Sequence, residues 1–214
     1  MKTELVFLLD RSGSMCGLEQ DTIGGFNSML EKQKQEAGEA RVTTVLFDGR
    51  VELLHDRLDI GDVAPITQRE YFVRGSTALL DAVGFAIQKI AAVQKNTAPE
   101  KRADKVLFVI TTDGYENASR EYSYEKVKEL VELEKEKYGW EFLFLGANID
   151  AAAAAGRFGI APDRAVNYHA DPEGTRLNYA VVSETVSCMR ACRPIEANWK
   201  ERIERDFRGR KARR

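Results

Sequence analysis

Three runs of apolar residues alternate with amphipathic stretches along the chain, and each run stops abruptly at polar residues. The runs cover residues 5–9, 106–110 and 142–145, and residues 165–169 are predicted to form a last short strand. A continuous apolar run of this length is typical of a strand that is covered on both faces, as in the centre of a parallel sheet. The pattern therefore predicts a buried sheet whose strands are separated by helices.

The amphipathic stretches carry apolar residues every three or four positions, which is the spacing of one helix face. This spacing predicts helices over about residues 21–35, 77–94, 123–138, 151–158 and 177–189. One pair of strands, residues 41–47 and 50–54, is only partly apolar, and the Asp48 and Gly49 pair between them is typical of a tight hairpin turn. We expect this antiparallel pair at an edge of the sheet.

The order of these elements is strand, helix, hairpin, helix, strand, helix, strand, helix, strand, helix. This order is that of an α/β fold with a doubly wound, mostly parallel sheet and helices on both faces. The length of 214 residues suits one such domain. We assign it to residues 1–192 and expect residues 193–214, which are rich in arginine from Arg202 onward, to form a mobile basic tail.

The composition excludes some classes of protein but does not indicate a particular function. Charged residues make up 31% of the chain, hydrophobic residues 43%, and the net charge is −2, so no global charge favours nucleic acid or a membrane. No apolar run approaches the roughly 18 residues of a membrane span, and the first run lacks the features of a signal peptide. We therefore expect a cytoplasmic protein. Its three cysteines are predicted to be free thiols, because their number is odd and no secretion signal is recognised. A zinc site at Cys188 and Cys192 is disfavoured, because neither histidine has ligand spacing to them.

The polar residues that are candidates for a functional site lie where two of the predicted buried strands end. Asp10, Ser12 and Ser14 follow the first strand, Asp113 follows the strand of residues 106–110, and Thr77 begins the helix between them. If those two strands are neighbours where the winding reverses, their loops face one crevice. Oxygen-only clusters suit hard cations such as Mg²⁺ and Ca²⁺. Each residue also has a simpler interpretation as a helix cap or a turn residue.

The three motifs together resemble the metal-ion-dependent adhesion site of the von Willebrand factor type A (vWA) domain family. They are Asp-x-Ser-Gly-Ser at 10–14, Gly-Ser-Thr at 75–77 and Thr-Asp-Gly at 112–114, and the resemblance covers about residues 1–170. It implies the sheet order 3-2-1-4-5-6 with an antiparallel third strand, which agrees with the hairpin. It also implies that Ser12, Ser14 and Thr77 supply hydroxyl ligands, while Asp10 and Asp113 act largely through waters and hydrogen bonds.

The resemblance implies a stand-alone intracellular member of bacterial type that binds Mg²⁺, with Mn²⁺ and Ca²⁺ left open. Neutral hydroxyl ligands leave the ion short of negative charge, so it favours a carboxylate from outside. The expected function is capture of an Asp or Glu of a partner protein in a multiprotein assembly. Intracellular members of the family often work with AAA+ ATPases. Arg11 and Met15, beside the predicted ligands, are candidates for contact with that partner.

Two other functions need weighing. A Mg²⁺-dependent hydrolase or phosphotransferase would want a second carboxylate two residues after the strand-end Asp10, but that position is Ser12. The chain also lacks a G-x-x-x-x-G-K-[ST] loop, a G-x-S-x-G elbow and an H-E-x-x-H helix, so we expect no enzyme. Nucleic-acid binding through the arginine-rich segment is the third hypothesis, against which a solubilising tail is favoured. Asp81, Glu116 and Asn117 are expected to be solvated or capping residues.

Overall fold

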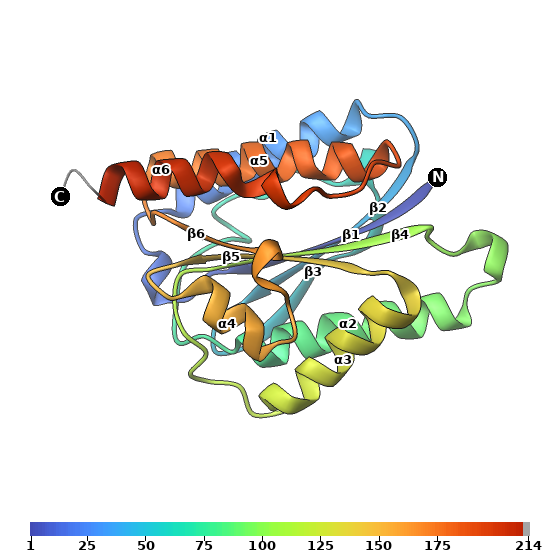
Figure 1. The fold of residues 1–214 in the computed structure, drawn as a ribbon, viewed down its shortest axis with the longest axis horizontal. Coiled ribbons are helices and arrows are strands. Elements are labelled where there is room, and N and C mark those ends of the chain that lie inside the picture. Colours follow the sequence, from blue (N-terminus) through green and yellow to red (C-terminus); the bar gives the residue numbers. More distant parts are fainter. Residues whose placement is uncertain (212–214) are drawn as a thin grey trace.

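A six-stranded sheet lies between two layers of helices in the computed structural model, which describes residues 1–211 (Figure 1). Its order is β3-β2-β1-β4-β5-β6, and only β3 is antiparallel to its neighbour, so the predicted sheet order and fold class are confirmed. The strands are β1 (Lys2–Asp10), β2 (Glu39–Phe47), β3 (Val51–Asp59), β4 (Lys105–Thr112), β5 (Glu141–Ala147) and β6 (Ala165–Tyr168).

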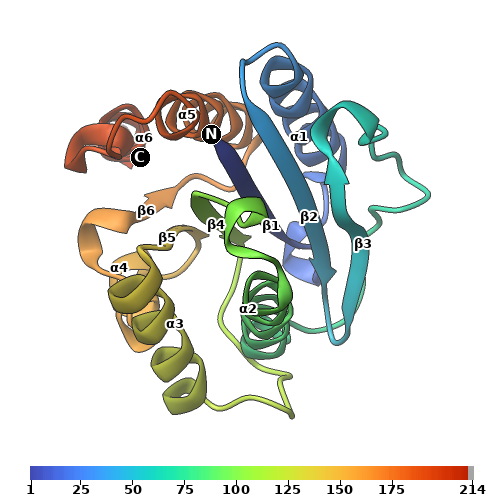
Figure 2. The ribbon, with the colours of Figure 1, turned by 90° about the vertical axis from the view of Figure 1, so that its right-hand side faces the viewer.

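Helices cover both faces of this sheet (Figures 1 and 2). One face carries α1 (Glu19–Lys34), α5 (Pro172–Arg190) and α6 (Glu201–Lys211), and the other carries α2 (Leu79–Asn96), α3 (Tyr124–Tyr138) and α4 (Ala151–Arg157). Alternate residues of β1 therefore enter two separate cores: Leu5, Phe7 and Leu9 pack in one, and Val6 and Leu8 in the other. This double burial explains why the strand is apolar without interruption.

The winding of the sheet reverses between β1 and β4. These strands pair in parallel, with Leu9 level with Thr111, so the loops that follow them leave the sheet at the same edge. A crevice at such a reversal is the usual ligand position in open α/β sheets. The fold thus brings the loop after β1 and the loop after β4 together, as the sequence predicted.

Among the described residues, no helix has both the length and the apolar character needed to cross a membrane. The three cysteines, Cys16, Cys188 and Cys192, are free thiols, as predicted.

The segment predicted to be a mobile tail is instead part of the folded unit. Residues 201–211 form α6, which packs against β6 and α5. Ile203 is buried, the ring of Phe207 lies 4.7 Å from that of His169, and Trp199 donates a hydrogen bond to the Asp163 carbonyl at 2.8 Å. Ile203 and Phe207 are four residues apart and share one helix face, a spacing that the many surrounding charges obscure in the sequence. Residues 212–214 of the predicted tail lie outside the described residues.

This packing predicts that Ile203→Ala destabilises the whole domain. Ile203 is 1% exposed, and removing a buried isoleucine side chain typically costs about 2–4 kcal/mol. Arg205→Ala in the same helix should cost less than about 1 kcal/mol, because its ion pair with Glu201 is exposed. Urea unfolding followed by circular dichroism checks both. Equal midpoints for Ile203→Ala and wild type would contradict the packing of α6.

Candidate functional site

Three loops form the candidate site, which we call the crevice: the first follows β1, the second precedes α2 and the third follows β4. Asp10, the last residue of β1, joins the first and third loops. Its buried carboxylate accepts a hydrogen bond from the Ser12 amide at 2.7 Å through Oδ1. Its Oδ2 accepts from Thr112 Oγ1 at 2.6 Å and from the Asp113 amide at 3.3 Å. Asp10 therefore orients both loops with one side chain, and both of its oxygens have partners on the protein.

The two serines of the first loop present their hydroxyls side by side. A 3₁₀ turn over Gly13–Met15 brings Ser12 Oγ and Ser14 Oγ to 3.1 Å from each other; Ser12 is buried and Ser14 is exposed. The Gly13 amide donates to the Gly75 carbonyl at 3.1 Å, which ties the first loop to the second. A Cβ on Gly13 would lie 3.3 Å from that carbonyl oxygen, so this approach leaves little room for a side chain.

Thr77 joins the second loop to the third. Its amide donates to Asn117 Oδ1 at 2.9 Å, and the Asn117 amide donates back to the Thr77 carbonyl at 3.0 Å. Thr77 is buried and lies two residues before the first residue of α2, so it does not start that helix as predicted. Glu116 accepts from the Leu80 amide and so caps the first turn of α2, as expected. Asp81 accepts from three amides of the loop after β4, so it holds that loop against α2 and caps no helix.

Asp113 completes the group from the third loop. It is buried and accepts a hydrogen bond from Asn148 Nδ2, a contact that adds the loop after β5 to the site. Its neighbour Gly114 lies against the first loop, where a Cβ would be 3.5 Å from Ser14 Oγ. Asn148 was not identified from the sequence, and Thr112 belongs to the Thr-Asp-Gly motif but had been given no role. The signal available for Asn148 was its position directly after the third buried strand, at the same sheet edge.

Burial opposes the charge of both carboxylates. It raises the pKa of Asp113 to about 6, the charge of Asp10 adds to this rise, and the hydrogen bond from Asn148 opposes it. Burial also raises the pKa of Asp10, against the hydrogen bonds from Ser12 and Thr112. Within residues 1–211, neither carboxylate forms an ion pair with a basic side chain. Two buried carboxylates and the neighbouring hydroxyls of Ser12 and Ser14 make a set of oxygen donors that fits a hard divalent cation.

No group of three or more His, Cys, Asp or Glu side chains within the described chain is arranged to hold a metal ion. Any metal at this edge of the sheet would therefore depend on serine and threonine hydroxyls as well as carboxylates. The resemblance described above implies the same combination of hydroxyl ligands with nearby carboxylates.

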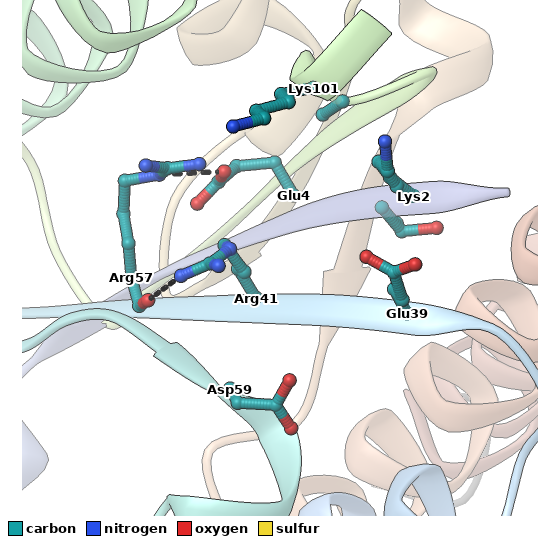
Figure 3. A pocket seen from close by; sticks show the side chains of 9 residues that line it. Lys2, Glu4, Glu39, Arg41, Arg57, Asp59 and Lys101 are labelled. Atoms are coloured by element: carbon teal, nitrogen blue, oxygen red, sulfur yellow. Dashed lines mark hydrogen bonds and ion pairs between the residues drawn. The ribbon is translucent and has the colours of Figure 1, made fainter. Parts of the chain in front are cut away.

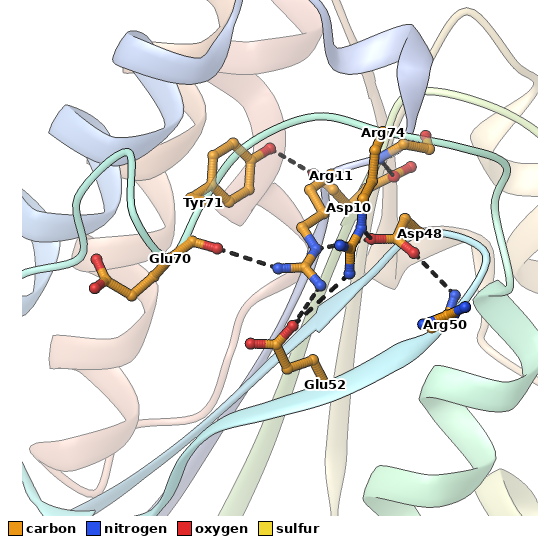
Figure 4. Close-up of polar contacts among 9 residues, drawn as sticks. Asp10, Arg11, Asp48, Arg50, Glu52, Glu70, Tyr71 and Arg74 are labelled. Carbon is orange, nitrogen blue, oxygen red and sulfur yellow. Dashed lines mark hydrogen bonds and ion pairs between the residues drawn. The ribbon is translucent and has the colours of Figure 1, made fainter.

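Arg11 and Met15 are buried, so neither can contact a partner as predicted. Arg11 instead supports the first loop from beneath (Figure 4). Its guanidinium pairs with Asp48 at 2.9 Å and Glu52 at 2.5 Å and donates to the Glu70 carbonyl at 3.1 Å. This network anchors the backbone immediately before Ser12 to β3 and to the segment that follows it.

A separate polar pocket of about 350 Å³ lies at the other end of β1 (Figure 3). Charged residues of both signs line it, and Glu4 pairs there with Arg57 at 2.8 Å. Glu4 is buried, which raises the pKa of its carboxyl. The pocket shares no residue with the crevice and does not include the predicted ligands.

Comparison with solved structures shows that the chain has the fold of vWA domains. The vWF domain of the type V pili tip protein Mfa5 from Porphyromonas gingivalis is 12% identical, with a TM-score of 0.64, and 87% of this chain covers 95% of that one. A von Willebrand factor type A structure from Catenulispora acidiphila is 11% identical (TM-score 0.57; 87% and 42% covered). Proximal thread matrix protein 1 from the mussel byssus, with a zinc-occupied MIDAS motif, is 12% identical (TM-score 0.54; 86% and 46% covered).

The chain thus spans less than half the length of two of these three structures. No protein-family model matches the sequence. No curated protein matches it either. At identities this low, the likeness establishes the fold alone.

Proposed function

We propose that the protein is a metal-dependent protein-binding module whose ligands are Ser12, Ser14 and Thr77, oriented by Asp10 and Asp113. The observation that carries this proposal is the pair of buried carboxylates, Asp10 and Asp113, which lie at one edge of the sheet and form no ion pair with a basic side chain among residues 1–211. A bound divalent cation would supply the missing positive charge. The zinc-occupied MIDAS motif of the mussel protein, which has the same fold, also supports a metal here.

The metal would act as a bridge to a partner. With neutral hydroxyls as its direct protein ligands, the ion keeps most of its attraction for an outside carboxylate. Ser14 is the one exposed member of the five residues, so the partner would approach from its side. Mg²⁺ is our choice of ion, with Mn²⁺ and Ca²⁺ as substitutes, because all the donors are oxygen atoms. The partner is a protein that supplies an Asp or Glu.

The other two hypotheses have less support. An enzyme would need a general base or nucleophile at the open side of the crevice, and the position two residues after Asp10 carries Ser12. Nucleic-acid binding would need free arginines on α6, but Arg202, Arg205, Arg208 and Arg210 each form an ion pair with a carboxylate. We therefore propose a non-enzymatic module, acting in the cytoplasm within a multiprotein assembly that an AAA+ ATPase would drive.

Titration calorimetry with MgCl₂ and MnCl₂ tests the metal site directly. Thr77→Ala should weaken binding by about tenfold or more, since it removes a proposed ligand. Ser76→Ala is the matched control, because Ser76 is exposed and its hydroxyl faces Gly49. Affinity capture with and without chelator then tests the partner contact, which should disappear both with chelator and in Thr77→Ala protein. Equal metal binding by wild type and Thr77→Ala would refute the proposed site.

A further inference from the structure

A second pocket lies at the end of the sheet opposite the crevice. It has a volume of about 510 Å³, and its lining residues come from the C-terminal halves of α2 and α3 and from the segments where β4 and β5 begin. Pockets that bind small molecules have volumes of about 300–1,000 Å³ and mostly apolar walls with a few polar groups. The residues that matter for its chemistry are Gln94, Val106, Leu133, Glu134, Tyr138 and Trp140.

Glu134 is the unusual member of this lining. The residue is only 4% exposed, yet within residues 1–211 its carboxylate has neither a hydrogen bond nor an ion pair. Burial raises the pKa of this carboxyl, and Lys137 offsets the rise only in part. Its oxygen atoms are not among the fully buried unpaired ones, so the carboxylate reaches the open space of the pocket, where a ligand can contact it.

The basic side chains around the pocket do not neutralise Glu134. Lys135 donates to the Gly159 carbonyl at 2.8 Å, and the Lys137 ammonium lies 5.2 Å from the centre of the Tyr138 ring. Arg102 donates to the carbonyls of Thr97 and Lys95. Lys95 is exposed at the rim. Gln94 adds a second unmatched polar group, because its buried Nε2 has no acceptor in the described chain.

Aromatic side chains form part of the lining, and one of them is held by stacking beneath it. Trp140 is buried and stacks on Phe108, with ring centres 5.5 Å apart and planes within 17°, and Phe108 stacks on Phe142. At the mouth of the pocket, Leu133 and Tyr138 are 48% and 55% exposed, two of the few large apolar side chains so exposed. An aromatic wall beside a carboxylate is the combination that binds organic cations.

We infer that this pocket binds a small amphipathic amine, with its ammonium against Glu134 and its apolar body between Trp140, Leu133 and Tyr138. The ligand would supply the positive charge that Glu134 lacks and cover the apolar rim. This site is separate from the metal crevice in both position and chemistry, so it stands whether or not the crevice binds a metal.

Fluorescence titration of Trp140 tests the inference, since the chain has only two tryptophans and Trp199→Phe isolates the signal. The probe is 2-phenylethylamine, in the presence of EDTA so that no metal contributes. It should cause a saturable change, while 3-phenylpropionate, with the same ring and the opposite charge, and ethylamine, with no ring, should bind about tenfold or more weakly. Equal responses to the amine and the carboxylate, or no saturable response to the amine, would overturn the inference.

Substitutions locate the site. Glu134→Gln, which keeps the shape of the side chain, should weaken 2-phenylethylamine binding by about tenfold or more. Glu136→Gln removes the same charge from the exposed face of α3 and should change nothing. Leu133→Lys, at an exposed position that the fold tolerates, should repel the amine and provides a second test. Unchanged binding in both Glu134→Gln and Leu133→Lys would place the amine elsewhere and refute the site.

Discussion

Arg11→Ala should destabilise the protein by about 3–5 kcal/mol, the usual cost of removing one partner from a buried ion pair. Arg11 is fully buried, and its guanidinium ties the loop after β1 to both Asp48 and Glu52. Without it, Asp48 keeps Arg74 at 2.8 Å, but Arg74 is half-exposed and solvent screens that pair. The loss should also loosen the backbone that positions Ser12.

Guanidinium chloride unfolding measures this effect, and Arg74→Ala is the matched control. Arg74 approaches the same Asp48 oxygen from the surface, where solvent screens the pair, so its removal should cost much less stability than the removal of Arg11. Arg11→Lys should restore little of the stability, because a single ammonium cannot reach two carboxylates and the Glu70 carbonyl as the planar guanidinium does. If Arg11→Ala and Arg74→Ala cost the same, the buried network does not anchor the loop.

The sheet could be predicted from the sequence because a strand that is buried on both faces requires a continuous run of apolar residues. The runs ending at Leu9 and Ile110 are apolar throughout since helices cover both sides of β1 and β4. The hairpin at Asp48 and Gly49 could also be predicted, because edge strands keep polar residues and the tight turn favours particular residue types. These signals are local, and each can be read within a few residues.

The residues that the sequence analysis missed make contacts with residues far away in the sequence. Arg11 looked like a surface residue, because its partners Asp48 and Glu52 are about 40 positions away and only the folded sheet brings them together. Asn148 was missed for the same reason, since it meets Asp113 only when β5 lies beside β4. The helix α6 was missed because Ile203 and Phe207 are its main apolar contacts among many charges. Pairing between distant polar residues leaves no periodic pattern to read.

The crevice illustrates a balance between stability and binding. Asp10 and Asp113 are buried and close enough for the charge of Asp10 to raise the pKa of Asp113. Such an arrangement weakens the empty protein, and a bound cation would reverse the penalty. Stability measured with and without metal should therefore respond in opposite directions to the loss of one carboxylate.

Asp113→Asn should accordingly stabilise the metal-free protein while it removes the response to metal. The pKa of Asp113 is raised from 3.8 to about 6, so the folded state holds the proton more tightly than the unfolded chain. Stability from this group is therefore present at low pH and falls as pH rises from about 4 to 6, and the full penalty applies above that range. A rise in pKa of this size corresponds to a penalty on the order of 1–3 kcal/mol above that range.

The melting temperature in EDTA should thus be higher for Asp113→Asn than for wild type at pH 8, and the gain should shrink to nothing near pH 4. The asparagine keeps an oxygen that can accept the hydrogen bond from Asn148, so the loop should retain its geometry. Excess MgCl₂ should then raise the melting temperature of wild type and leave the variant unchanged, because the variant lacks the charge that holds the ion. A variant that is less stable than wild type in EDTA at pH 8 would show that the Asp113 charge is neutralised within the protein itself, and the electrostatic basis for a metal in this crevice would be lost.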